Sequence, residues 1–67
     1  MAERIAALTP QQRNILSLMA AGKPNKIIAY ELGIAETTVK AHITLILRKL
    51  GVFSRTQAVL AARDLVS

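Results

Sequence analysis

Apolar residues recur at helical spacing along most of the chain, in blocks that glycine and proline separate. The first block starts like a helix, because Thr9 can serve as N-cap, Pro10 suits the first helical position and Gln12 completes a capping box. Gly22 and Pro24 end it. The spacing therefore predicts a helix over about residues 10–21 with an apolar face of Ile15, Leu16, Leu18 and Met19.

Two further blocks are joined by a short glycine turn. The pattern predicts a short helix over 25–32, with Ile28, Ala29 and Leu32 directed inward. Gly33 can adopt the left-handed conformation that ends this helix. A longer helix is expected over 36–50, where five apolar residues fall within one sector at about 100° per residue: Val39, Ile43, Ile46, Leu47 and Leu50.

The last block follows Gly51 and begins with a second capping box, Ser54 and Gln57. Its apolar stripe consists of Ala58, Val59, Ala61, Ala62, Leu65 and Val66. No alternating strand pattern occurs. We therefore predict an all-α, four-helix (tetrahelical) domain over residues 8–67, preceded by a linker or lead-in over 1–7.

A short helix, a turn of three residues that contains glycine and a longer helix form a helix-turn-helix arrangement. In such motifs the second helix enters the major groove of DNA. Opposite its apolar sector, the 36–50 helix carries small, hydroxylic and basic residues, which suit close contact with bases and phosphates: Thr37, Ala41, Thr44 and Arg48, flanked by Lys40 and Leu45. An ordinary solvated face is the alternative, and the i,i+4 pair of Glu36 and Lys40 agrees with it.

Charge favours a polyanionic partner without deciding the matter. The 67 residues carry nine basic and four acidic side chains, a net charge of +5. There is no cysteine, a single histidine and no apolar run of the ~18 residues that a membrane span needs. No paired carboxylates, activated nucleophile or cofactor loop is visible. We expect a cytoplasmic, non-enzymatic domain without metal, cofactor or membrane partner.

Several residues have two or more interpretations. Lys26 is placed to meet the phosphate backbone, because the first helix of the motif crosses it, or is a solubilising surface lysine. His42 lies at the edge of the apolar sector as a packing or phosphate-contacting residue. Leu45 touches a thymine methyl group, packs on another subunit or has no role. The last helix gives part of its apolar surface to the core and part to a second copy, or gives all of it to the core. The candidates for the pairing are Ala58, Ala61, Ala62 and Leu65.

Four strings carry a resemblance to a known family: Leu8-Thr9-Pro10, residues 22–29, residues 32–42 and residues 46–52 with 55–59. Together they resemble the LuxR-type (GerE-like) helix-turn-helix, most closely the C-terminal effector domain of NarL/FixJ response regulators. The chain has no tryptophan and does have Asn25-Lys26, which favours a response regulator over a quorum-sensing member. A stand-alone regulator and a helical protein-interaction module remain alternatives.

The resemblance implies sequence-specific binding of double-stranded DNA in bacterial transcription regulation, with the 36–50 helix in the major groove. By position, Lys40, Ala41 and Thr44 match groove-facing residues, and Lys26, Thr37, Thr38 and His42 match or neighbour backbone contacts. The implied partners are a second copy bound through the last helix, RNA polymerase as a further candidate, and an N-terminal receiver domain outside this chain. Pro24 and Ala35 stand where serine is usual, which removes two N-caps.

Overall fold

The computed structural model describes residues 1–66, with side chains up to residue 63. Five helices form in this range and no strand, which confirms the all-α class: α1 (Ala2–Ala6), α2 (Pro10–Ala20), α3 (Asn25–Leu32), α4 (Glu36–Leu50) and α5 (Arg55–Val66). The last four occupy the ranges that the sequence pattern predicts. The first was not expected.

Both predicted capping boxes are present. At the start of α2, the Gln12 amide N–H donates to the Thr9 hydroxyl and the Thr9 amide N–H donates to the Gln12 side chain, each at 3.1 Å. Before α5, the Gln57 amide N–H donates to Ser54 Oγ at 3.2 Å, and the Gln57 side chain accepts from Ser54 and Phe53. These bonds satisfy N–H groups that a helix start leaves unpaired, so local sequence fixes where both helices begin.

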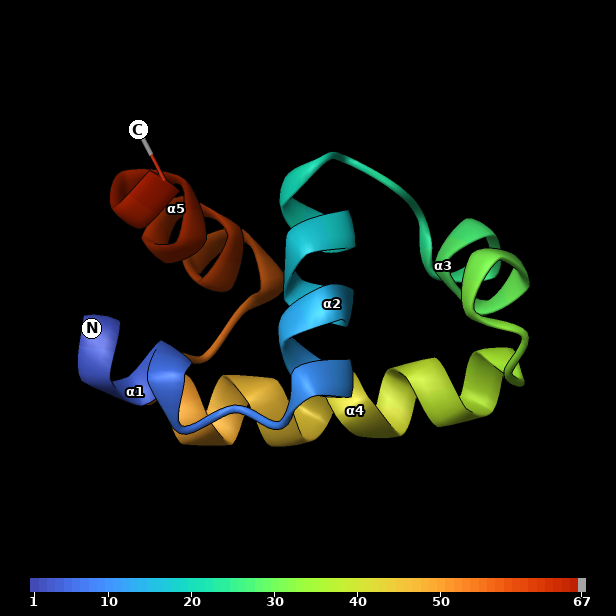
Figure 1. The fold of residues 1–67 in the computed structure, drawn as a ribbon, viewed down its shortest axis with the longest axis horizontal. Coiled ribbons are helices and arrows are strands. Elements are labelled where there is room, and N and C mark those ends of the chain that lie inside the picture. Colours follow the sequence, from blue (N-terminus) through green and yellow to red (C-terminus); the bar gives the residue numbers. More distant parts are fainter. Residues whose placement is uncertain (67) are drawn as a thin grey trace.

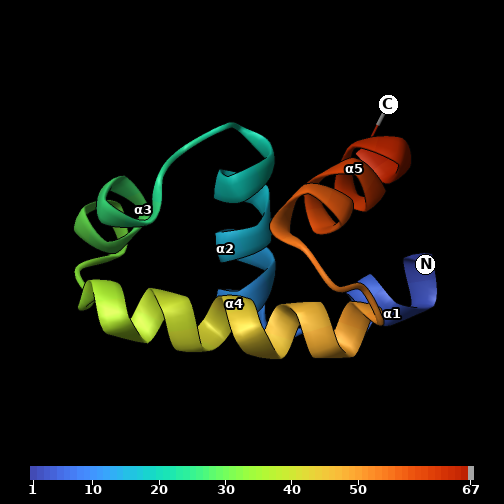
Figure 2. The same cartoon turned by 180° about the vertical axis from the view of Figure 1, so that it is seen from behind.

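α4 is the longest helix and lies along the longest axis of the molecule (Figure 1). α2 stands across its middle. α3 and α5 lie on opposite sides of α2, as the view from behind also shows (Figure 2). α3 is next to the N-terminal end of α4 and α1 is next to its C-terminal end. One side of α4 is therefore covered along its whole length, and the other side forms an edge of the molecule.

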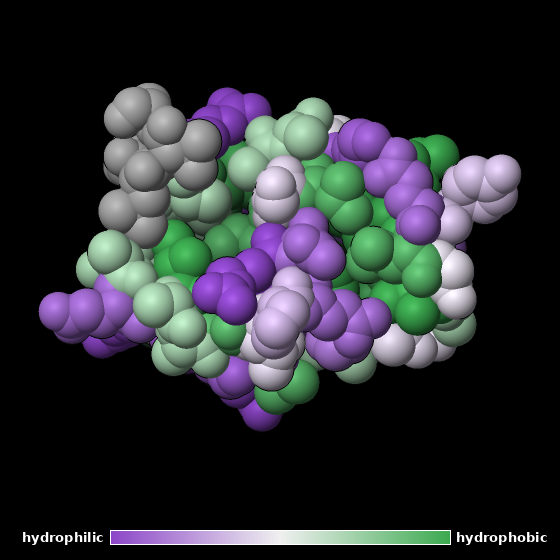
Figure 3. Space-filling model, viewed as in Figure 1, coloured by the Kyte–Doolittle hydropathy of each residue, from purple (hydrophilic) through white to green (hydrophobic). Residues whose placement is uncertain are grey.

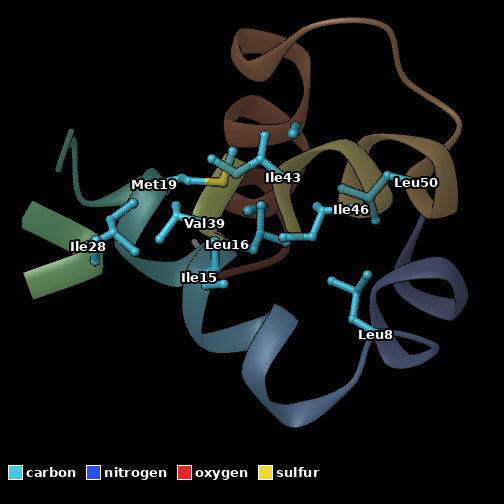
Figure 4. Close-up of a cluster of buried hydrophobic side chains, with 12 residues drawn as sticks. Leu8, Ile15, Leu16, Met19, Ile28, Val39, Ile43, Ile46 and Leu50 are labelled. Carbon is cyan, nitrogen blue, oxygen red and sulfur yellow. The ribbon is translucent and has the colours of Figure 1, made fainter. Parts of the chain in front are cut away.

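The core lies where α2, α4 and α5 meet, and the side chains of Ile15, Leu16, Met19, Ile43 and Ile46 converge there (Figure 4). Four of the five predicted inward residues of α4 are buried, and the fifth, Leu47, is partly buried against the cluster. Each fully buried aliphatic side chain contributes about 1.5–3 kcal/mol. This packing, more than intrinsic helix propensity, holds α4 in place.

Within residues 1–7, expected to be a linker or a lead-in to the domain, residues 2–6 form the helix α1. α1 has no side-chain N-cap and only one turn, too little for a periodic pattern to reveal. Its support comes from distant residues. The Arg4 guanidinium donates to the Leu50 carbonyl at 3.0 Å, and Lys49 Nζ donates to the Ala7 carbonyl at 3.5 Å. A cation at the last carbonyls of α4 also matches the negative end of its dipole.

Candidate nucleic-acid interface

The turn between α3 and α4 sets the angle at which α4 leaves the motif. Gly33 has φ +68°, a left-handed conformation, although an added Cβ would meet nothing within 4 Å. Glycine is therefore favoured there for its backbone freedom and not for lack of space. The Ile34 amide N–H donates back to the Ala29 carbonyl at 3.1 Å, and the Ile34 side chain packs against the core. The backbone hydrogen bond and the packed Ile34 side chain together hold the turn in place.

The outward side of α4 is exposed along its whole length. Hydrophilic residues lie beside hydrophobic ones along the lower edge of the molecule, where α4 runs (Figure 3). The exposed residues include all the predicted groove-facing ones and Leu45: Thr37, Thr38, Lys40, Ala41, Thr44, Leu45 and Arg48. The Thr44 hydroxyl donates to the Lys40 carbonyl of the preceding turn at 3.1 Å. These mostly short side chains permit close approach to a partner.

The basic residues divide into two groups. Five of the nine donate hydrogen bonds within the molecule: Arg4, Lys23, Lys49, Arg55 and Arg63. Within the part of the chain that the structure describes, the side chains of the other four make no hydrogen bond or ion pair. Three of those four, Lys26, Lys40 and Arg48, belong to α3 and α4, and only Arg13 lies elsewhere. The unpaired positive charge is thus concentrated on the helix-turn-helix.

The Glu36–Lys40 pair that the spacing allows is not formed. Among residues with described side chains, the one ion pair joins Lys23 to Glu31 at 2.5 Å, at the edge of α3. Lys40 consequently keeps its charge uncompensated beside Ala41 and Thr44. An ordinary solvated helix face would be expected to pair its charges along the helix, so the arrangement favours a polyanion as the partner of this face.

The N-termini of α3 and α4 each add positive potential to the motif. Their N-cap residues, Pro24 and Ala35, make no side-chain cap hydrogen bond, in agreement with the sequence. Uncapped N–H groups at a helix start attract anions, an effect that the helix dipole reinforces. Lys26 is exposed in the first turn of α3, and Thr37 and Thr38 are exposed in that of α4.

His42 lies at the border between the core and the outward side of α4. The residue is half-buried, and its Nδ1 is enclosed without a hydrogen-bond partner among the described atoms. An enclosed nitrogen cannot reach a ligand, so any polar contact to a partner has to come from the other ring nitrogen. The half-buried position fits either of the two interpretations, packing or phosphate contact.

The structure corrects the expected dimer surface on α5. Ala58 and Ala62 are buried in the core, at 0% and 7% exposure, so their side chains cannot contact a second copy. The sequence pattern could not separate the two uses, because small residues suit both a tight core and a helix pair. Ala61 is half-buried, and the side chain of Leu65 lies outside the described residues.

Arg55 has a structural role that the sequence did not reveal. Its guanidinium donates to the Asn25 side chain and, at 2.7 Å, to the Lys23 carbonyl. These bonds join the start of α5 to the first residue of α3 and to the loop before it. The sequence gives no sign of this contact, because residues thirty positions apart carry no local signal of contact.

No helix in the described chain is long and apolar enough to cross a membrane. The described residues also contain no group of three or more histidine, cysteine or acidic side chains positioned for a metal ion.

Comparison with known proteins gives a specific match. The family model of bacterial regulatory proteins of the luxR family (GerE) matches residues 6–62. A glycerol metabolism activator of Pseudomonas putida is 56% identical over 63 residues, which are 94% of this chain and 28% of that protein. The nitrate/nitrite response regulator protein NarL of Escherichia coli strain K12 is 51% identical over 51 residues, 76% of this chain and 24% of that protein.

The DNA-binding transcriptional activator DevR/DosR of Mycobacterium tuberculosis is 43% identical over 61 residues, 91% of this chain and 28% of that protein. The chain thus spans about a quarter of the length of these relatives. The match includes the whole helix-turn-helix and most of α5. The chain belongs to the luxR family of bacterial regulatory proteins and is a helix-turn-helix domain of the DNA-binding, transcription-regulating kind.

Proposed function

We propose that this domain binds a specific DNA sequence as the output domain of a bacterial response regulator, with α4 in the major groove. The observation that carries the proposal is the concentration of unpaired basic residues on the helix-turn-helix, next to short side chains on the outward side of α4. Lys40, Ala41, Thr44 and Arg48 face base edges, and Lys26, Thr37, Thr38 and His42 adjoin the phosphates. The response-regulator assignment rests on the likeness to NarL.

The proposal is tested by measuring affinity for double-stranded DNA against salt concentration. Each phosphate that the domain neutralises should contribute about 0.9 to the slope of log affinity against log salt. Lys26→Ala should reduce the slope by about one unit, because it removes one phosphate contact. Arg63→Ala is the matched control, since Arg63 lies on α5 and donates to the Ala20 carbonyl. Binding that does not depend on salt, or no binding to any DNA, would contradict the proposal.

The domain acts on its site together with a second copy, since two-fold proteins read near-palindromic sites. With Ala58 and Ala62 in the core, the candidate contact surface on α5 is reduced to Ala61 and Leu65. Ala61→Glu should weaken cooperative binding to two adjacent half-sites and leave affinity for one half-site unchanged. Sedimentation on DNA of one and of two half-sites measures both. A loss of affinity for the single half-site would indicate that Ala61→Glu disturbs the fold and not the contact with a second copy.

An N-terminal receiver, RNA polymerase and a cytoplasmic location complete the proposal. We base all three on the family, and the receiver also on the length of the relatives, of which this chain spans about a quarter. No enzymatic activity is proposed.

A further inference from the structure

Ala41, Thr44, Leu45 and Arg48 form one stripe on the outward side of α4, at spacing i, i+3, i+4, i+7. All four are exposed. Leu45 is 43% exposed, in the middle of the helix and on the side away from the core. Leu45 is not part of the hydrophobic core. The stripe that contains it is also the part of α4 proposed to enter the groove.

The hydrogen bond of Thr44 changes the chemistry of this stripe. Its hydroxyl donates to the Lys40 carbonyl at 3.1 Å, so its one proton is already bound to the helix backbone. Towards a partner the side chain offers its methyl group and, from oxygen, only an acceptor. Together with the Ala41 methyl and the Leu45 side chain, it makes the centre of the stripe apolar, between the cationic side chains of Lys40 and Arg48.

In the major groove, the apolar feature of a base edge is the C5-methyl group of thymine. Four helical residues rise about 6 Å, close to the ~6.8 Å of two base-pair steps. The span from Ala41 to Leu45 therefore suits contacts to neighbouring base pairs. The flanking cations match phosphates or guanine edges on either side.

We propose that Ala41, Thr44 and Leu45 read thymine methyl groups, and that Leu45 is a specificity-determining residue of this domain. The inference rests on the proposed DNA-binding function. It assigns much of the base discrimination to apolar contact, with Arg48 and Lys40 at its two ends. The preferred half-site should hold thymine at one or more positions under the middle of α4.

The test first selects bound sequences from random duplex DNA and then replaces each thymine by deoxyuridine, which removes only the methyl group. At the positions under α4, the wild-type chain should bind about fourfold more weakly for each methyl group lost. Leu45→Ala should weaken binding to the thymine duplex and bring the thymine-to-uracil ratio near one at its position. Leu60→Ala is the matched control, an exposed leucine on α5 whose loss should leave every ratio unchanged.

Thr44 is examined with two variants. Thr44→Val keeps the methyl group and should preserve the thymine-to-uracil ratio, whereas Thr44→Ser keeps the hydroxyl and should lower it. Circular dichroism shows whether each variant is folded. If the domain binds its selected DNA and no uracil substitution matters, the inference is overturned and DNA binding stands. If Leu45→Ala and Thr44→Ser both retain full discrimination, the assignment to these residues is wrong. If no DNA is bound, the proposed function fails as well.

Discussion

The inward and outward sides of α4 differ in what their residues do for the molecule. On the inward side, Val39, Ile46 and Leu50 have 0% exposure, and each touches the core shared with other helices. On the outward side, the side chains of Lys40 and Arg48 have no partner within the described chain, and the Thr44 hydroxyl donates to a carbonyl of its own helix. The inward side of α4 thus stabilises the fold, and the outward side offers side chains to a partner. We therefore expect substitutions on one side to change stability and substitutions on the other to change binding.

Adjacent residues on the two sides should give the largest contrast. Ile46→Ala removes a fully buried side chain and should cost about 2–5 kcal/mol of unfolding free energy, through lost burial and the cavity left behind. That is a large fraction of the ~3–10 kcal/mol expected for a domain of this size. Leu45→Ala, one residue away and exposed, should stay within about 0.5 kcal/mol of wild type. Urea denaturation followed by circular dichroism measures both, and equal losses would refute the division.

Gly33 ends α3 and Gly51 ends α4, and the two glycines differ in what surrounds them. A Cβ on Gly51 would lie 1.8 Å from the Arg4 guanidinium, whereas a Cβ on Gly33 meets nothing. Both have positive φ, so Gly33→Ala should cost about 1–2 kcal/mol from backbone strain alone. Gly51→Ala should cost about 2–3 kcal/mol, since the Arg4–Leu50 hydrogen bond is also lost.

The extra cost at Gly51 should disappear in an Arg4→Ala background, where no guanidinium remains to be displaced. A double-mutant cycle by urea denaturation measures this coupling. Additive effects of Arg4→Ala and Gly51→Ala would show that α1 does not support the end of α4.

Two lysines of α4 should respond in different assays. Lys40→Ala removes an unpaired outward cation and should weaken DNA binding by about 1–3 kcal/mol if the contact is to a base, with little effect on stability. Lys49 donates to the Gln12 side chain at 3.0 Å, so Lys49→Ala should instead cost about 1 kcal/mol of stability. DNA titration and denaturation of both variants measure the four effects. A loss of affinity for Lys40→Ala that is equal on all sequences would make Lys40 a phosphate contact.

The smallest expected effect is a gain. Ala35→Ser supplies the missing N-cap of α4 and should add about 1 kcal/mol of stability, by accepting a hydrogen bond from the first turn. For a domain of this size the melting temperature should rise by about 4–8 °C. A thermal melt without DNA measures it, with Ala35→Gly as a matched cap of weaker effect. No rise would indicate that the turn holds residue 35 in a geometry that a serine hydroxyl cannot use.

The helices that begin at Pro10, Asn25, Glu36 and Arg55 could be predicted from the sequence because their determinants are local. Apolar periodicity, two capping boxes and the glycines at 33 and 51 all act within a few residues of the position that they fix. The inward side of α4 followed from the same count. The same count predicts the residues opposite the apolar sector, and the side chains of Lys40 and Arg48 are exposed there.

The order of the last four helices, and the apolar side of each, can therefore be read from the sequence. The tertiary structure alone decided the contacts between distant residues, such as Arg4 with Leu50 and Arg55 with the loop before α3. It also decided that Ala58 and Ala62 belong to the core, and which basic residues are paired. The physical reason is that a helix forms from interactions within one or two turns. A side chain's partner depends on how the helices pack together.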